Sequence, residues 1–295
     1  MKILVTGASG WIGSATLPRL VARGHEVVAT ARSDSAATTL STAGVTVVRA
    51  DLEDPESMTR AAEGCDAVIH LAYHHDFTQI DRAAEMDRSV LEGFGEVLAG
   101  SGSPLLVASG VLGVAQEGLA RESDPQTGPF ARSHTATWVT TLSDRGIQPV
   151  LMRFPPTVHG RGDVGFLRRF VEAASSRGAA AYVDEGQTRW SAVHRDDAAD
   201  LIVKVVERPT ESRVHAVGEE GVSMRDIAEA IGVSLGIPTV SISRDQAQAE
   251  MGFLGMLMTV DASASSELTQ RVYDWRPEGP TLLEDVRNGA YLDPA

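Results

Sequence analysis

The chain has 295 residues, enough to bury a large core, and its 43% hydrophobic and 22% charged residues are ordinary for a soluble globular protein. A net charge of −14 without any basic stripe argues against a nucleic-acid partner. No apolar run approaches the ~20 residues of a membrane span, and we expect neither a signal peptide nor a membrane partner. Cys65 is the single cysteine, which excludes an internal disulfide and predicts a cytoplasmic location.

The first twenty residues combine a strand pattern, a glycine-rich turn and the start of a helix. Residues 2–6 are apolar and β-branched, and Gly7, Gly10 and Gly13 follow at intervals of three. Gly7 permits a tight turn, Gly10 lets the backbone approach phosphates, and Gly13 lets the helix pack against the strand. Because free N–H groups at the helix start attract an anion, the loop predicts a dinucleotide site. The other residues assigned to this loop are Ser9, Trp11 and Ile12.

Short apolar runs then alternate with helical patterns as far as residue 155, which predicts βαβ units and a doubly wound parallel sheet. We expect strands at residues 2–6, 26–31, 45–49, 67–71, 104–108 and 149–153. We expect helices between them at residues 12–23, 36–43, 55–63, 80–99 and 132–145.

After Arg153 this rhythm ends at Pro155 and Pro156. The following patterns predict helices at 166–177, 196–207 and 223–235, and strands at 190–193 and 214–217. The predicted fold class is therefore α/β, a Rossmann domain with a smaller mixed C-terminal substrate lobe. We expect the Rossmann domain to comprise residues 1–155 plus about 190–207, and the lobe to comprise residues 156–189 and 208–295.

Several segments resemble, in matching order, the extended short-chain dehydrogenases/reductases of the NAD-dependent epimerase/dehydratase family. Thr6 and the three glycines resemble their TGxxGxxG loop, and residues 68–72 and 153–160 resemble later segments. The resemblance implies that Asp51 and Leu52 touch adenine, that Leu71 and Ala72 lie against the cofactor, and that Pro155 passes the nicotinamide. His159 stands where the family has Tyr. Residues 190–198 also match, and we expect Asp and His there to brace the structure.

The end of the second predicted strand favours NADP(H) over NAD(H). NAD-binding Rossmann domains hold the adenosine ribose with a carboxylate at this strand end, whereas NADP binders place an Arg nearby. Here Ala31 occupies the expected acid position and Arg32 follows it. Arg32 can pair with a 2′-phosphate, and Ser33 can add a hydroxyl. The alternative is an Arg that only ends the strand, with Asp34 as a displaced acid.

The Tyr-x-x-x-Lys pair that the family uses for proton transfer is absent. Only two of the 26 basic residues are lysines, Lys2 and Lys204, and neither follows a tyrosine by four positions. Aligning the helix by the strand after it puts Gly128 in the Tyr position and Arg132 in the Lys position. Arg132 can hold the cofactor ribose, but its pKa is too high for proton shuttling.

Other side chains are therefore candidates for the chemistry. Ser109 follows the fifth strand at the carboxyl edge of the sheet, where open α/β sheets bind ligands, although it can also be a plain turn serine. Tyr73, His134 and the histidines at 74 and 75 are candidate proton donors. We expect no metal site, because no third ligand accompanies the adjacent histidines at a recognisable spacing.

The leading hypothesis is an NADP(H)-dependent oxidoreductase that acts on a small-molecule carbonyl or hydroxyl in the cleft between its lobes. Ser109 would orient the oxygen, and Tyr73 or a histidine would supply the proton. The missing dyad leaves two alternatives open. One is a non-redox isomerase, dehydratase or cyclase that retains the cofactor, and the other is a dinucleotide-sensing regulator without chemistry. A homodimer is possible, because extended members of the family often dimerise.

Overall fold

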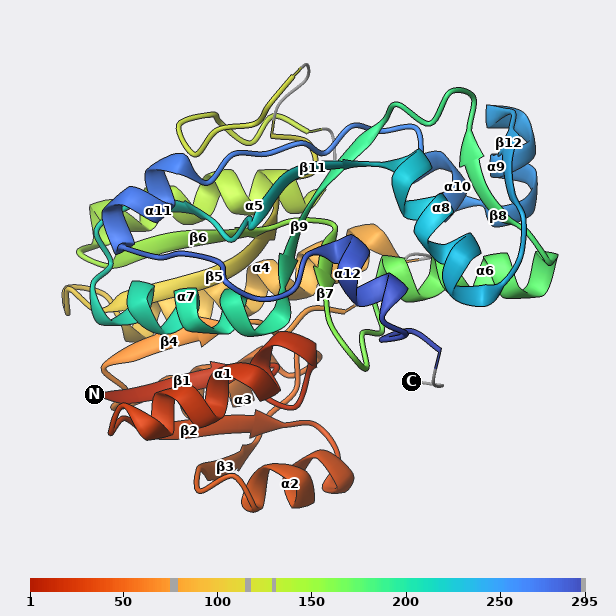
Figure 1. Ribbon diagram of the computed structural model, residues 1–295. Coiled ribbons are helices and arrows are strands. Elements are labelled where there is room, and N and C mark those ends of the chain that lie inside the picture. Colours follow the sequence, from red (N-terminus) through yellow and green to blue (C-terminus); the bar gives the residue numbers. More distant parts are fainter. Residues whose placement is uncertain (75–78, 115–117, 129–130, 293–295) are drawn as a thin grey trace. The chain divides into compact units, whose positions relative to one another are not determined.

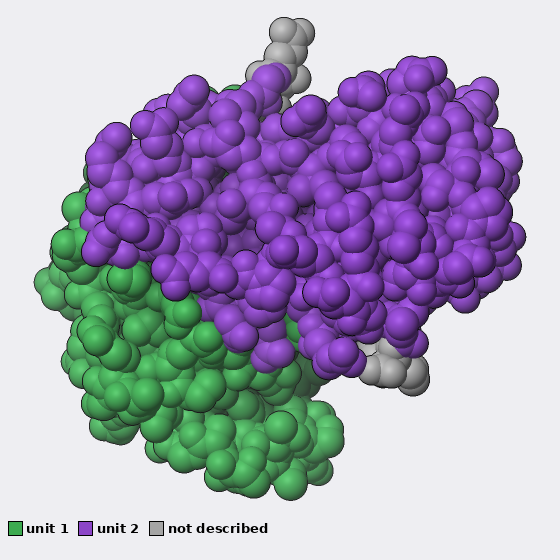
Figure 2. Space-filling view, in the orientation of Figure 1, with its two compact units in different colours: residues 1–109, 125–153, 199–214 green, residues 110–124, 154–198, 215–295 purple. Residues whose placement is uncertain are grey.

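The computed structural model describes residues 1–74, 79–114, 118–128 and 131–292, with only the backbone described at residue 131. The chain forms two compact units (Figure 2). Unit 1 comprises residues 1–109, 125–153 and 199–214, and unit 2 comprises residues 110–124, 154–198 and 215–295.

A seven-stranded sheet forms the centre of unit 1 (Figure 1). Its order is β10-β6-β5-β4-β1-β2-β3, and β1 pairs in parallel with both β2 and β4. The strand order therefore reverses at β1, the topology of a doubly wound dinucleotide-binding fold, and the predicted α/β class is confirmed. The strands are β1 Lys2–Thr6, β2 Glu26–Ala31, β3 Thr46–Arg49, β4 Ala67–His70, β5 Pro104–Gly110, β6 Gln148–Phe154 and β10 Arg213–His215.

Helices cover both faces of this sheet. One face buries Leu4, Val68 and Leu105 against α3, α4 and α5, because alternate strand residues point to the same side. On the other face α1 lies beside α7, where Arg19 bonds Asp200 and Arg23 bonds Glu207. The helices are α1 Trp11–Ala22, α2 Asp34–Ser41, α3 Pro55–Ala62, α4 Ile80–Val97, α5 Ala131–Val139 and α7 Arg195–Glu207.

Unit 2 contains two small sheets and several helices around a separate apolar core. Trp190 is fully buried in this core and packs against the ring of Phe170. The strands are β7 Thr157–His159, β8 Ala180–Val183, β9 Arg189–His194, β11 Glu219–Ser223 and β12 Thr239–Ile242. The helices are α6 Phe166–Arg177, α8 Met224–Leu235, α9 Arg244–Met251, α10 Phe253–Leu257, α11 Glu267–Tyr273 and α12 Leu282–Arg287.

Two predicted elements differ from the structure for identifiable reasons. The strand expected at 214–217 in the C-terminal lobe is β10, an edge strand of the large sheet, and Leu151 N–H donates to the Ser212 carbonyl beside it. The helix expected at 132–145 ends at Val139 and continues as a 3₁₀ helix, η1 Thr140–Arg145. Hydroxyls of Thr140 and Ser143 donate to carbonyls three residues earlier, which suits the tighter turn.

The compact units also differ from the expected boundaries. Residues 110–124 and 190–198 group with unit 2, although we expected both segments in the Rossmann domain. Segment 110–124 does so because Glu122, 5% exposed, accepts from the N–H and hydroxyl of Thr269 at 2.8 Å each. Residues 190–193 lie in β9, which pairs with β7 and β11 of the same unit.

Candidate functional site

The glycine loop of unit 1 turns directly over the end of β4. Gly7 has φ +64°, and a Cβ added there would lie 2.7 Å from the Ala72 nitrogen and 2.8 Å from the Leu71 carbonyl carbon. A Cβ on Gly13 would lie 2.3 Å from the Gly7 carbonyl oxygen. Both positions thus require glycine, one for conformation and close approach, the other for contact between helix and loop.

The start of α1 has the properties of an anion site. Gly10 is its N-cap, has no side chain to accept hydrogen bonds, and is exposed together with Ser9. No acidic residue lies in the first turn, while Trp11 and Ile12 are half-buried. Uncapped N–H groups and the positive end of the helix dipole favour a negative group here. The loop therefore fits the pyrophosphate of a dinucleotide.

The end of β2 carries an exposed arginine. Arg32 is exposed, and within the described residues its guanidinium has no recorded ion pair or hydrogen bond. Asp34, the possible displaced acid, lies 3.2 Å from the Arg49 guanidinium. Ser33 has a structural role, because its Oγ caps α2 by accepting from Ala36 N–H at 3.2 Å. Arg32 is thus available to an anionic ligand, and Ser33 is already engaged.

The pair after β3 forms a turn. The Asp51 carboxylate accepts from Glu53 N–H at 3.1 Å, and Leu52 is half-buried against the apolar core of unit 1. Asp54, not Asp51, is the N-cap of α3. Adenine contact by Asp51 and Leu52 remains a prediction.

Tyr73 and Arg132 are in contact near the glycine loop of unit 1. Arg132, on α5, lies with its guanidinium carbon 3.9 Å from the centre of the Tyr73 ring and donates to the Ala108 carbonyl at 3.0 Å. Tyr73 immediately follows Ala72, the residue that contacts Gly7. The structure thus joins two of the predicted catalytic residues and links both to the end of β5.

Burial favours the phenol form of Tyr73. Burial raises the pKa of Tyr73, the Arg132 guanidinium lowers it, and the Asp87 carboxylate raises it, with a net upward shift. A protonated phenol is a proton donor, and a stacked guanidinium stabilises the phenolate that remains after donation. The structure thus places a buried phenol and a guanidinium in contact, and a catalytic role for the pair remains a prediction.

The other candidates have different surroundings. Ser109, 6% exposed, is next to the carbonyl that Arg132 binds. His134 is exposed on α5, and His74 is half-buried. The histidine at position 75 lies outside the described residues. Pro155 is buried in unit 2 between β6 and β7, and its contact with a nicotinamide remains a prediction.

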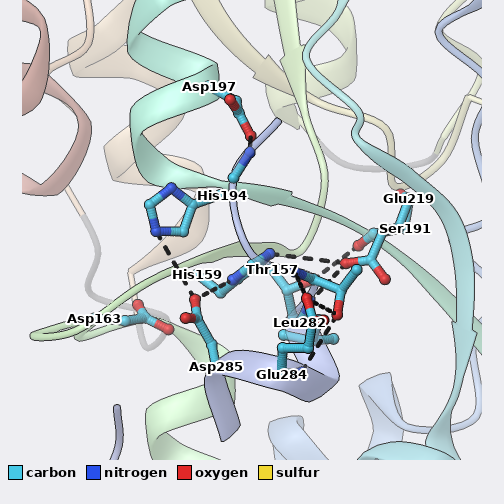
Figure 3. A network of polar contacts seen from close by, with 12 residues as sticks. Thr157, His159, Asp163, Ser191, His194, Asp197, Glu219, Leu282, Glu284 and Asp285 are labelled. Carbon is cyan, nitrogen blue, oxygen red and sulfur yellow. Dashed lines mark hydrogen bonds and ion pairs between the residues drawn. The ribbon is translucent and has the colours of Figure 1, made fainter. Parts of the chain in front are cut away.

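A second polar cluster lies wholly within unit 2 and was not foreseen from the sequence (Figure 3). Buried His159 has its Nδ1 2.6 Å from Asp285 Oδ2 and its Nε2 3.8 Å from Glu219. His194 Nε2 is 3.9 Å from the same Asp285 oxygen. His159 was noted in place of a family Tyr, but its partner is 126 residues away and leaves no local signal. The cluster joins α12 to β7, β9 and β11.

Two further acidic residues, Asp163 and Asp197, form hydrogen bonds that stabilise unit 2. Tyr291 donates to Asp163 at 2.8 Å, and burial raises the pKa of both groups. Asp197 accepts from the N–H groups of Glu278 and Gly279 at 3.1 and 2.9 Å. These contacts hold the C-terminal segment of unit 2 and give segment 190–198 a bracing role.

The described residues contain neither a membrane-spanning helix nor a metal-ligand cluster. No helix there is both long and apolar enough to cross a bilayer. No group of three or more His, Cys, Asp or Glu side chains there is placed to hold a metal ion.

Comparisons with known proteins identify similar sequences and similar structures. Residues 3–218 match the profile of the NAD dependent epimerase/dehydratase family. The chain is 39% identical over 295 residues to an uncharacterized protein of Schizosaccharomyces pombe, covering 99% of this chain and 100% of that one. It is 30% identical over 215 residues to 2-alkyl-3-oxoalkanoate reductase of Stenotrophomonas maltophilia, covering 68% of this chain and 63% of the reductase.

The fold also resembles solved structures. UDP-glucose 4-epimerase of Thermus thermophilus, in complex with NAD, superimposes with a TM-score of 0.75 at 20% identity, and 98% of each chain is covered. At this identity the likeness concerns the fold alone.

Proposed function

Because the chain belongs to the NAD dependent epimerase/dehydratase family, whose members use NAD(P), we propose that it is an NADP(H)-dependent reductase of a small-molecule carbonyl. The observation that carries the proposal is the Tyr73 phenol, stacked under Arg132 beside the glycine loop. Similarity to a named reductase supports the redox reading over a rearrangement.

The glycine loop and the start of α1 would hold the cofactor pyrophosphate, and Arg32 would pair with a 2′-phosphate. A cofactor held there would provide the hydride needed to reduce a carbonyl carbon. The availability of Arg32, with Asp34 already paired to Arg49, supports NADP(H) over NAD(H).

Tyr73 would supply the proton that the carbonyl oxygen needs. Its O–H bond breaks as the new O–H bond of the alcohol forms, and the electron pair stays on the phenolate oxygen. Arg132 stabilises that phenolate from the ring face until solvent returns the proton. Ser109, next to the carbonyl held by Arg132, would hydrogen-bond the substrate oxygen.

The experiment is NADPH oxidation by the purified protein over a broad panel of ketones and aldehydes, with product analysis. We expect turnover that Tyr73→Phe reduces by roughly a hundredfold or more, as for the loss of a general acid. Tyr182→Phe is the matched control, because Tyr182 also lies under an arginine, Arg225, at 4.9 Å, but in unit 2.

Other outcomes would overturn the proposal. Turnover without any net change in cofactor redox state would indicate an isomerase or dehydratase instead. Dinucleotide binding without turnover of any panel member, in wild type and variants alike, would indicate a sensing role.

A further inference from the structure

A buried polar triad, Thr6, His70 and Asp87, lies beneath the segment that carries Tyr73. His70 Nε2 is 3.0 Å from Asp87 Oδ1, and His70 Nδ1 is 2.8 Å from Thr6 Oγ1. Thr6 Oγ1 also accepts from Ala72 N–H at 3.2 Å. Thr6, His70 and Asp87 are 0%, 1% and 5% exposed. Three elements, β1, β4 and α4, thus converge on one backbone N–H.

The hydrogen-bond directions follow from the chemistry of the groups. Ala72 N–H can only donate, so Thr6 Oγ1 accepts from it. The Asp87 carboxylate can only accept, so His70 Nε2–H donates to it, and in a neutral ring Nδ1 then accepts from the Thr6 hydroxyl. Each donor in this chain of hydrogen bonds then has one acceptor, and the neutral His70 ring is the Nε2–H tautomer.

Burying the Asp87 carboxylate costs free energy that apolar packing alone does not offset. Its neighbours on α4 include buried Ala84, Val90 and Leu91, and the Phe94 ring meets the edge of His70 at 5.5 Å. A buried carboxylate costs free energy unless its interactions compensate for lost hydration. The one recorded hydrogen bond of its carboxylate among the described residues goes to His70. Its charge therefore acts on few groups, and Tyr73 is one of them.

We propose that Asp87 and His70 are positioning residues that act on Tyr73. Through Thr6 they hold Ala72 N–H against Gly7, which sets where the next residue's ring lies under Arg132. The Asp87 charge opposes that of Arg132, and the two set how readily Tyr73 gives up its proton. The charged or titratable groups in play are Arg132 from α5, Asp87 from α4 and His70 from β4. This inference rests on Tyr73 being the proton donor.

The first test titrates Tyr73 directly, without any substrate. Tyrosine labelled with ¹³C at Cζ gives one NMR signal for each ring, and Tyr73→Phe assigns the signal of interest. Asp87→Asn keeps an acceptor for His70 and removes the charge, so we expect Tyr73 to titrate lower by on the order of one pH unit. Glu85→Gln, an exposed acid on the same helix, is the matched control and should leave the midpoint unchanged. An unchanged midpoint in Asp87→Asn, or an equal shift in Glu85→Gln, overturns the proposal.

A second pair of variants tests the positioning if Asp87→Asn does not fold. Thr6→Val removes the hydroxyl and leaves Ala72 N–H without this acceptor, whereas Thr6→Ser keeps the hydroxyl. We expect Thr6→Val to weaken NADPH binding by roughly tenfold and to move the Tyr73 signal, with Thr6→Ser close to wild type. Equal behaviour of the two variants overturns the proposal. Absence of carbonyl reduction by wild type would instead count against the proposed function, because neither readout here requires turnover.

Discussion

Alanine at Gly7 tests whether the glycine loop is set by conformation alone or also by close approach. Gly7 has φ +64°, and Gly24, at the end of α1, has a similar φ of +78° with nothing within 4 Å of an added Cβ. The left-handed conformation costs an Ala about 1–2 kcal/mol at either site. At Gly7 alone, the new methyl would also press on the Ala72 nitrogen at 2.7 Å, which adds about 1–3 kcal/mol of overpacking.

We therefore expect Gly24→Ala to lower the free energy of unfolding by about 1–2 kcal/mol and Gly7→Ala by about 2–5 kcal/mol. The measurement is urea unfolding of the cofactor-free proteins, followed by NADPH titration at low denaturant. Gly24→Ala should bind NADPH like wild type, whereas Gly7→Ala should bind poorly because the loop must move away from β4. Equal losses of stability and unchanged NADPH binding in both variants would refute the reasoning.

Three further predictions concern charge. Arg32→Ala should lower the preference for NADPH over NADH by roughly tenfold to a hundredfold, measured by binding of both cofactors, and an unaltered ratio would contradict the assignment. Arg60→Ala is its control, since Arg60 lies with Lys2 and Glu26 near the opposite ends of β1 and β2. Burial raises the pKa of Asp163 when folded, so its ionisation opposes folding, and stability from this group is full below about pH 4 and falls as the pH rises through the folded pKa. Wild type should thus lose stability relative to Asp163→Asn in urea titrations as the pH rises above about 4, and parallel curves would exclude this. The hydrogen bond from Arg23 lowers the pKa of Glu207, so its contribution is present above about pH 4.3 and is lost as the pH falls through the folded pKa. The stability gap between wild type and Glu207→Gln should close on acidification, and a gap independent of pH would argue against the pair.

Local signals explain what was predictable. The glycine spacing, the β-branched runs and the helix patterns each depend on neighbouring residues, so the strands of the large sheet were located to within a few positions. Arg132 was found by counting back from a strand, and Tyr73 by its place after β4. That the two side chains stack could not be foreseen, because 59 positions separate them and the contact depends on how α5 packs beside β4.

The polar cluster of unit 2 was even harder to predict from the sequence. His159 stands where the family has Tyr, but nothing near it in sequence identifies Asp285 as its partner, because that contact depends on α12 packing against three strands. Arg32 is the opposite case. Its availability depends on the pairing of Asp34 with Arg49, which joins the start of α2 to the end of β3 and which a sequence pattern allows but does not specify.

The alternation of the two units along the chain affects how the protein folds during synthesis. Unit 1 needs residues 199–214 to complete its sheet, and unit 2 needs residues 110–124 and everything after residue 215. Neither unit is complete in any contiguous fragment shorter than most of the protein. The ribosome must therefore release the chain as far as residue 215 of 295 before β10 can close the sheet edge. Until then β6 has an open edge, the kind of transient surface on which chaperones and aggregation compete. A truncation at the unit boundary after residue 198 would therefore leave the large sheet without β10.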